Sequence, residues 1–265
     1  MQKTQNIIFS DLDGTLIDHS TYSYKAALDA VSLLKKKKIP LIFCTSKTRA
    51  EIEKYRKELG IKDPFISENG GAIFVPKKYF DFGFDFDRET KEYKIIELGT
   101  PIKRLLKAIA KTKEKGYDVT TFSAMSVKQL SKDCCLKHDD AKKAKMREYD
   151  EAFKINNEKD EPKINELIKK HGFHFTKGGR YCHITGNNDK GKAVKILTSL
   201  FKRKYHKIKT IGLGDGQNDI PMLKEVDVAV IVKNSANPKL KVNFEVIRTK
   251  EEGPRGWNNT VKKLV

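Results

Sequence analysis

The sequence predicts an α/β protein in which a doubly wound parallel sheet is interrupted by an inserted α+β domain. Three observations support this fold class. In the first and last parts of the chain, short apolar runs alternate with amphipathic stretches, and this alternation is typical of a parallel sheet covered by helices. Two apolar runs end in closely spaced carboxylates, and open α/β sheets place their chemistry at that end of a strand. Between about residues 85 and 184 the alternation gives way to another pattern.

The first part of the chain predicts four strands and two helices. The strands are expected at 7–10, 40–44, 64–67 and 72–75, and the helices at 23–38 and 47–59. Gly60 directly follows the second helix, and a glycine in that place is a common helix stop. In the last part the same order resumes with a helix at 189–203, a strand at 208–213, a helix at 220–225 and a strand at 228–232.

The middle of the chain predicts an α+β insertion. Helices are expected at 101–115, 125–132, 138–146 and 161–171, and a strand at 148–155. The runs at 173–176 and 181–185 are expected to pair as a hairpin across residues 177–180. We therefore expect a core domain made of 1–84 and 185–265, and an α+β domain made of 85–184.

Composition narrows the function classes. The 265 residues carry 54 Lys and Arg against 35 Asp and Glu, a net charge of +19. The lysines are scattered over most expected helices and no nucleic-acid motif is present, so an anionic substrate is a better explanation than nucleic acid. The sequence contains no run of about 18 apolar residues, so no transmembrane helix is expected. The N-terminus leads directly into a strand and not into a signal peptide, so we expect a cytoplasmic protein. The four cysteines form no Cys-x-x-Cys pair, so no zinc site is expected.

The first candidate site is Asp11-Leu12-Asp13-Gly14-Thr15, directly after the strand at 7–10. Residues two apart in a strand point the same way, so Asp11 and Asp13 are expected to face one site. One carboxylate can act as a nucleophile and the other as an acid and base. Because two such charges repel each other, the pair implies a cation, and oxygen ligands suit Mg²⁺. The alternative is a turn that is merely rich in aspartate.

The second candidate site is the stretch 212–219, which follows another strand and contains Asp215 and Asp219. Together with Asp11 and Asp13, the latter through its backbone carbonyl, these acids would make an oxygen ligand set for Mg²⁺. Asp219 could bind the ion directly, bind it through water, or orient Asn218. Gln217 stands where a dinucleotide fingerprint requires its third glycine, so that motif is excluded.

Two further positions could bind a phosphoryl group. The stretch 186–192 has the spacing of a P-loop, but Ala193 replaces the required hydroxyl residue, so we interpret Lys190 as a phosphate-neutralising cation near a helix N-terminus. Thr45 and Ser46 follow the second strand, where either hydroxyl could donate to a phosphoryl oxygen or cap the next helix. The residues leave open which of the two does so.

Together these motifs resemble the haloacid dehalogenase superfamily of phosphatases, and the insertion resembles its type IIB cap subclass. The matching order is Asp11-x-Asp13-x-Thr15, Thr45, Lys190 and Gly214-Asp215-Gly216-x-Asn218-Asp219. The resemblance implies that Asp11 attacks phosphorus to form an aspartyl-phosphate, and that Asp13 protonates the leaving oxygen and then activates water. It also implies that Thr45 and Lys190 hold the phosphoryl oxygens, that Asp215 helps to bind Mg²⁺, and that the insertion is a substrate-specificity cap.

A finer resemblance is to the mannosyl-3-phosphoglycerate phosphatases. It rests on four segments, at 45–51, 67–73, 147–151 and 253–258. It implies Mg²⁺-dependent hydrolysis of a phosphorylated sugar acid to mannosylglycerate, a compatible solute, and phosphate. The alternatives are a sucrose-phosphate or glucosyl-3-phosphoglycerate phosphatase, a phosphomutase, and a basic binding protein without catalysis.

Such a substrate carries a phosphate, a carboxylate and sugar hydroxyls, and the chain offers partners for each. Guanidinium and ammonium groups can bind the phosphate and the carboxylate, and the backbone amides of glycines can donate hydrogen bonds to the same anions. Polar side chains such as Glu and Asn can form hydrogen bonds with the sugar hydroxyls. The residues expected to bind substrate are Ser46, Glu68, Asn69, Gly70, Arg147, Lys177, Gly178, Gly179, Arg180 and Asn218, with Glu148 and Arg255 as further candidates. Trp257 could form a sugar platform, although a place in the core is expected.

Overall fold

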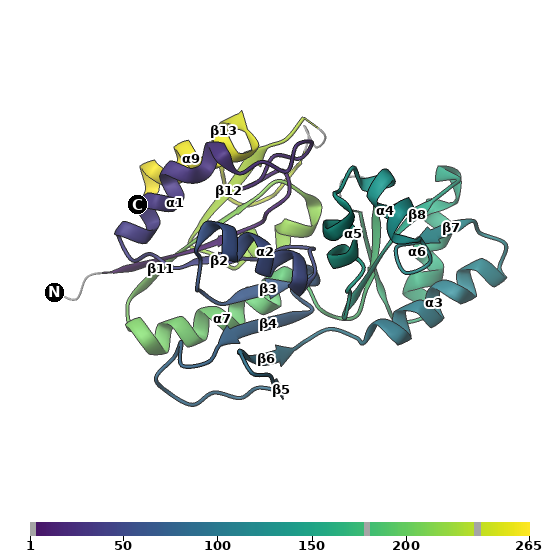
Figure 1. Cartoon of the computed structure of the whole chain (residues 1–265), viewed down its shortest axis with the longest axis horizontal. Helices are drawn as coiled ribbons and strands as arrows, with labels where there is room; N and C mark the ends of the chain where they lie inside the picture. The colour runs from purple at the N-terminus through teal and green to yellow at the C-terminus, as the bar shows by residue number, and fades with distance from the viewer. Residues whose placement is uncertain (1–3, 178–180, 236–239) are drawn as a thin grey trace.

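The computed structural model describes residues 4–177, 181–235 and 240–265. Two parts lie side by side, a larger one that contains both ends of the chain and a smaller one built from its middle (Figure 1). No helix in the described ranges has the length and apolar character needed to cross a membrane.

The centre of the larger part is a five-stranded parallel sheet. Its order is β13-β12-β11-β1-β2, and every neighbouring pair runs parallel. The strands are β1 (Gln5–Ser10), β2 (Leu41–Phe43), β11 (Ile208–Gly214), β12 (Val228–Lys233) and β13 (Ile247–Glu252). The buried stretches of the central strands, such as 7–9 and 211–214, are apolar because helices cover both faces of the sheet. The predicted doubly wound parallel sheet is confirmed.

Five helices cover this sheet, with α1 and α9 on the face opposite α7 (Figure 1). Their bounds are α1 (Leu28–Lys36), α2 (Arg49–Leu59), α7 (Lys190–Tyr205), α8 (Ile220–Lys224) and α9 (Gly253–Leu264). Alternate residues of β1 point to opposite faces of the sheet. Ile8 packs in the core under α1, α2 and α9, whereas Ile7 and Phe9 pack under α7 and α8. Trp257 is fully buried in the first of these cores, and its Nε1 donates to Ser10 Oγ at 2.9 Å. The tryptophan is therefore a core residue, as expected.

Local sequence signals explain where several helices begin and end. Thr48 caps α2 together with Glu51 in a reciprocal capping box, and Gly60 ends the helix in the left-handed conformation. The helix expected at 23–38 is shorter in the structure, because a 3₁₀ turn, η1 (Lys25–Ala27), precedes α1.

A second, antiparallel sheet extends the larger part. Its order is β3-β4-β6-β5, with β3 (Phe65–Ser67), β4 (Ala72–Pro76), β5 (Arg88–Glu89) and β6 (Tyr93–Glu97). A parallel bridge from Cys44 to Ile66 joins it to the end of β2. The 3₁₀ turn η2 (Glu68–Gly70) connects β3 to β4.

The smaller part is an antiparallel sheet covered by helices on both faces. Its strand order is β7-β8-β10-β9. The elements are α3 (Ile102–Glu114), β7 (Val119–Thr121), α4 (Val127–Cys134), α5 (His138–Ala144), β8 (Asp150–Ile155), η3 (Glu158–Asp160), α6 (Glu161–Lys170), β9 (His174–Lys177) and β10 (Cys182–Thr185). Phe153 and Ile184 pack against α3 and α6, whereas Ala152 packs on the opposite face with α4 and α5. The second face turns toward the larger part.

Candidate active site

Buried carboxylates gather where β1 and β11 end, at the carboxyl edge of the central sheet. Asp11 directly follows β1, and its backbone N–H donates to Leu213 of β11 at 2.9 Å. Asp215 directly follows β11, and Asp219 ends the 3₁₀ turn η4 (Gln217–Asp219). The parallel pairing of the two strands therefore brings together acids that are about 200 positions apart in the sequence.

Lys190 lies in the middle of these acids. It is the first residue of α7 and is fully buried. Its Nζ donates to Asp11 Oδ1 at 2.7 Å and to Asp219 Oδ1 at 2.6 Å. The same ammonium therefore fixes one carboxylate from each of the two acidic motifs.

The loop after β11 is held by its own carboxylates. Asp219 Oδ2 accepts the backbone N–H of Asp215 and of Gly216, both at 2.9 Å. Asp215 in turn accepts from Thr15 Oγ1 at 2.7 Å and from Asn234 Nδ2 at 2.5 Å. Each carboxylate thus has a fixed orientation before any ligand binds.

Gly14 makes this close approach possible. Its φ of +74° lies in the left-handed region, and a Cβ placed there would come within 2.7 Å of Asp215 Oδ2. Any other residue would meet both backbone strain and a direct clash with the acid.

Burial, with a smaller contribution from the neighbouring carboxylates, raises the pKa values of Asp11 and Asp215. Burial raises the pKa of Asp11 well above its ordinary value, and Lys190 only partly offsets the burial. Burial and the nearby Asp219 raise the pKa of Asp215 to about 7. For Lys190, burial lowers the pKa, but the carboxylates of Asp11 and Asp219 outweigh it, so the net shift is upward.

The acidic group has the composition of a divalent metal site. One carboxylate oxygen from each of Asp11, Asp215 and Asp219 lies within 4.8 Å of the others. When all three acids are ionised, Lys190 balances one charge and leaves two negative charges. Hard divalent cations prefer such oxygen donors, so the residues present fit a bound metal ion.

Asp13 is paired with a lysine and is not a member of this group of three acids. Lys47 Nζ lies 2.9 Å from Asp13 Oδ2 and 3.5 Å from Glu51 Oε1. The ammonium also lies over the ring of Tyr22, 5.4 Å from its centroid. The other oxygen, Asp13 Oδ1, is buried without a hydrogen-bond partner among the described residues.

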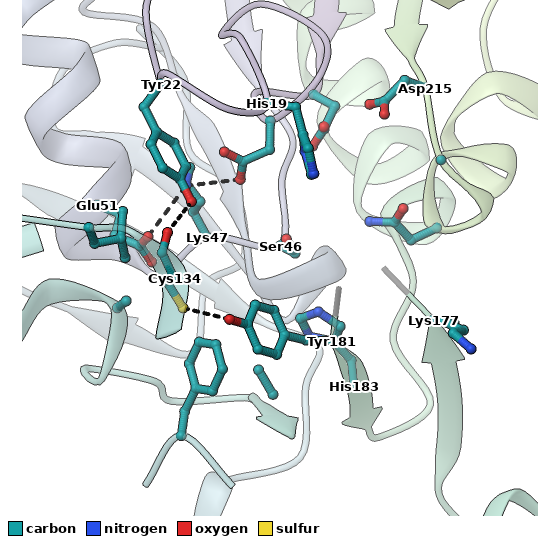
Figure 2. Close-up of a pocket in the computed structure, with 18 of the residues that line it drawn as sticks. His19, Tyr22, Ser46, Lys47, Glu51, Cys134, Lys177, Tyr181, His183 and Asp215 are labelled. Atoms are coloured by element: carbon teal, nitrogen blue, oxygen red, sulfur yellow. Dashed lines mark hydrogen bonds and ion pairs between the residues drawn. The ribbon is translucent and has the colours of Figure 1, made fainter. Parts of the chain in front are cut away.

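The two hydroxyl residues after β2 differ in position. Thr45 is fully buried, and its Oγ1 accepts the backbone N–H of Lys47 at 3.4 Å. Ser46 lines the cavity over the acids (Figure 2). Of the two residues, only Ser46 lines the described cavity.

This cavity lies between the two parts of the molecule. Its walls on the larger part include Asp11, Asp13, Ser46, Lys47, Asp215 and Asn218. Its walls on the smaller part include Phe122, Arg147, Ala152, Lys177, Tyr181 and His183. One wall is thus acidic and polar, and the facing wall is largely aromatic and basic.

Arg147, Lys177 and Asn218, all predicted to bind substrate, line the cavity. The guanidinium of Arg147 already contacts Asp150 Oδ1 at 2.9 Å, and Lys177 Nζ lies 2.6 Å from Glu161 Oε2. Asn218 Nδ2 donates to Asn69 Oδ1 at 3.0 Å.

Other predicted residues lie elsewhere. Gly178, Gly179 and Arg180 lie outside the described residues. Arg255, on α9, is exposed and is not part of the cavity wall. The carboxylate of Glu148 pairs with Arg88 at 2.8 Å.

Glu68, Asn69 and Gly70 were also predicted to bind substrate, but none of them lines the described cavity. Glu68 and Asn69 join the two parts of the molecule, and Gly70 packs within the larger part. Glu68 Oε2 accepts the backbone N–H groups of residues 148–150 at 2.9, 2.7 and 3.0 Å. Asn69 Nδ2 donates to Asp150 Oδ2 at 2.7 Å. Gly70 has a φ of +83°, and a Cβ there would lie 2.1 Å from the carbonyl oxygen of Asp189. Their polar groups are thus used within the protein.

Glu68 should make the stability of the protein depend on pH. Burial raises the pKa of this carboxyl from 4.5 to about 8, against smaller opposite effects of Arg147 and of the backbone N–H of Tyr149. Between those two values the folded protein holds a proton that the unfolded chain has released, so the free energy of unfolding falls as the pH rises. We expect Glu68→Gln to remove this pH-dependent part of the free energy of unfolding. Urea unfolding across the window should show the wild type losing stability relative to the variant, and parallel pH curves would contradict the expectation.

Sequence reasoning missed several cavity residues, and the polar ones among them include Lys47, His183 and Asn234. Lys47 lies inside the segment at 45–51 that was singled out, so its position was a usable signal. His183 and Asn234 acquire their places through contacts with residues 33 and 19 positions away, Asp150 and Asp215. A local sequence pattern carries no sign of such contacts.

A family model and the sequences of known proteins both match this chain, and the two comparisons agree with each other. Residues 8–254 match the family model described as haloacid dehalogenase-like hydrolase. A protein of Methanococcoides burtonii named glucosyl-3-phosphoglycerate/mannosyl-3-phosphoglycerate phosphatase is 48% identical, with 98% of this chain and 97% of that protein aligned. A mannosyl-3-phosphoglycerate phosphatase of Pyrococcus furiosus is 39% identical, with 85% and 90% aligned.

A solved structure agrees with the fold. It is described as a sugar phosphatase of subclass IIB of the same superfamily, and it matches with a TM-score of 0.66 at 18% identity, covering 98% of this chain and 99% of that one. The family model, which spans most of the chain, and the near-complete alignment with the relatives lead to one conclusion: this chain belongs to the haloacid dehalogenase-like hydrolase family.

Proposed function

We propose that this protein is a Mg²⁺-dependent phosphatase that hydrolyses mannosyl-3-phosphoglycerate to mannosylglycerate and phosphate. The observation that carries the proposal is the buried group of Asp11, Asp215 and Asp219 around Lys190. Asp11 and Asp215 of this group line a cavity whose opposite wall is basic and aromatic. The names of the relatives from Methanococcoides burtonii and Pyrococcus furiosus supply the substrate. Glucosyl-3-phosphoglycerate is a second candidate substrate, because the first of these names includes it.

In the proposed first step, a carboxylate oxygen of Asp11 attacks phosphorus while the bond from phosphorus to the glycerate oxygen breaks. Asp13 gives its proton to that leaving oxygen. Asp13 Oδ1 is suited to this exchange because it has no partner among the described residues, whereas Oδ2 is held by Lys47. Lys190 touches Asp11 and would offset the negative charge of the phosphoryl oxygens there.

In the second step, Asp13 takes a proton from water, whose oxygen attacks the phosphorus of the aspartyl-phosphate and releases phosphate and free Asp11. We propose that Ser46 or Thr45 donates to a phosphoryl oxygen and that Asp11, Asp215 and Asp219 hold Mg²⁺, with Asp13 contributing its backbone carbonyl. When bound, Mg²⁺ would neutralise charge on the phosphoryl group and on these acids.

We also propose that the inserted segment forms a cap over the core, for which the sequence predicts bounds of 85–184 for the cap and of 1–84 and 185–265 for the core. The pairing of β6 with β4 supports a first boundary just after Glu97, later in the chain than the one expected from sequence. Closure of the cap would exclude bulk water from the phosphoryl group, which favours the charge interactions that the reaction uses. A cytoplasmic location belongs to the same proposal.

Removal of divalent cations should stop phosphate release. We expect EDTA to abolish activity, Mg²⁺ to restore it, and Asp215→Asn to raise the Mg²⁺ concentration needed for half-maximal activity by at least about 10-fold, because even indirect partners of a metal commonly cost that much. Mg²⁺ should also raise the melting temperature of the wild type more than that of the variant. Full activity in EDTA would overturn the metal assignment, whereas activity restricted to other sugar phosphates would overturn only the named substrate.

A colorimetric assay of free phosphate also separates the alternatives. A phosphomutase would convert the substrate without releasing phosphate. A basic binding protein would release none and would bind nucleic acid in a salt-sensitive manner that Asp11→Asn leaves unchanged.

A further inference from the structure

His183 stands in the cavity wall opposite the acids, and the proposed reaction gives it no role. It lies on β10 directly beside Ala152 of β8 in the strand register, on the sheet face that turns toward the cavity. Its side chain lines the cavity beside Tyr181 (Figure 2).

One edge of the His183 ring is fixed by a fully buried carboxylate. Nδ1 lies 2.8 and 3.0 Å from the two oxygens of Asp150. Asp150 also accepts from Arg147 at 2.9 Å and from Asn69 Nδ2 at 2.7 Å. Although burial alone would raise the pKa of Asp150, Arg147 and His183 bring the net shift below its ordinary value, so the group is ionised. An ionised carboxylate only accepts hydrogen bonds, so Nδ1 of His183 carries the proton.

The other edge of the ring is open to the cavity. Nε2 of His183 makes no hydrogen bond to any described residue. It is not among the described polar atoms that are buried without a partner, so this nitrogen is not buried. An unpaired nitrogen that is not buried, on a residue that lines the cavity, is in contact with the cavity space. When the imidazole carries a single proton, that proton is on Nδ1 beside Asp150, and Nε2 is then a hydrogen-bond acceptor.

The surroundings of this acceptor favour a hydroxyl donor. Phe122 and Ala152 make the neighbouring wall apolar, and the ring of Phe122 packs edge-on against Tyr181 with centroids 4.8 Å apart. An apolar and aromatic wall with one fixed acceptor suits a hexose, whose faces are apolar and whose rim carries O–H donors.

We propose that His183 is a substrate-binding residue whose Nε2 accepts a hydrogen bond from a hydroxyl group of the hexose, and that Asp150 is the positioning residue that fixes the ring. This inference rests on the proposed function, because it concerns the sugar of that substrate. Through Asn69, which also contacts Asn218, the histidine is connected to the acidic loop of the larger part.

Two substitutions separate this role from a purely structural one. In His183→Asn, the amide nitrogen stands near the place of Nδ1 and can still donate to Asp150, but no polar atom reaches the cavity. In His183→Gln, a polar atom reaches the place of Nε2, but the donor to Asp150 is lost. A structural role predicts that asparagine is the better replacement, whereas substrate binding predicts glutamine.

The experiment measures kcat and KM for phosphate release by wild type and both variants with mannosyl-3-phosphoglycerate and with p-nitrophenyl phosphate, an ester without sugar. We expect His183→Asn to raise KM for the sugar substrate about 10-fold, as loss of a hydrogen bond in a desolvated site does. His183→Gln should retain most of the affinity, and kcat/KM for p-nitrophenyl phosphate should change less than about twofold in either variant.

Each other outcome contradicts the proposal. A wild-type KM in His183→Asn would show that the ring only serves Asp150. An equal loss on both esters would show a general defect of the site. The proposed function is judged separately, by the wild type alone: if it cleaves p-nitrophenyl phosphate but no glycosyl phosphoglycerate, the substrate assignment fails, and the hexose role of His183 fails with it.

Discussion

Asp11→Asn should lower phosphate release by at least about 10⁴-fold, the scale seen when the nucleophile of a covalent mechanism is removed. The amide is close to the carboxylate in shape, but it is a poor nucleophile toward phosphorus. Because burial already raises the pKa of Asp11, a neutral side chain in this place should not destabilise the fold. Steady-state assays with mannosyl-3-phosphoglycerate and Mg²⁺ measure the loss.

A matched control replaces Asp29, an exposed aspartate in the first turn of α1, with asparagine. This variant should keep wild-type activity. Rapid quenching of the wild type in acid with ³²P-labelled substrate should trap label on the protein, and Asp11→Asn should trap none. Undiminished turnover in the variant, or label that persists in it, would mean that another residue attacks phosphorus.

Lys190→Met should cost both activity and stability. Methionine has a similar straight side chain, but it leaves Asp11 and Asp219 buried without their ammonium partner. Breaking a buried ion pair from one side costs about 3–5 kcal/mol, and loss of a group that stabilises developing charge costs about 10²–10³-fold in kcat. Urea unfolding in EDTA measures the first quantity, and phosphate release with saturating Mg²⁺ measures the second.

Lys192→Met is the control for this substitution. Lys192 is on the same helix, but its side chain is about half exposed and bonds to Asn187 at the surface. Its loss should change stability by less than about 0.5 kcal/mol. Equal effects of the two substitutions would show that the position of the ammonium among the acids has no special importance. Added Mg²⁺ should raise the stability of Lys190→Met more than that of the wild type, since the cation then balances more charge.

The parts of the fold that follow from local pattern could be predicted from the sequence. The strands before Asp11 and Asp215 are short apolar runs, and parallel pairing places their ends together, so the two acidic motifs could be expected at one edge. Thr48, Glu51 and Gly60 show the ends of α2 in the same local manner.

Other elements have weak local signals. The strand β5 has two residues and β7 has three, lengths at which strand and loop patterns look alike. The strand β13 is mostly exposed and charged, and α9 begins at Gly253-Pro254, which reads as a turn. These elements form because tertiary contacts, such as the burial of Trp257, outweigh local preference.

The candidate site shows the same division. Acids, Lys190 and the hydroxyl residues were singled out because their chemistry is visible in residue type and spacing. Glu68 and Asn69 were expected at the substrate because they are polar and lie in a glycine-rich turn, but their partners lie about 80 positions along the chain. Whether a polar side chain meets a ligand or a distant backbone amide depends on packing that no local pattern reveals.

The turn at Glu68–Gly70 bears on how such proteins could be recombined. Exchange of the inserted segment between two relatives at its two connections would leave this turn behind in the recipient. The turn supplies the acceptor for three amides of the insert, and Gly70 lies against the backbone at Asp189. A chimera would then have mismatched surfaces wherever the two parents differ there. Grafting residues 67–71 together with the insert should keep these contacting surfaces compatible. The segments that must be exchanged together are therefore separate in the gene.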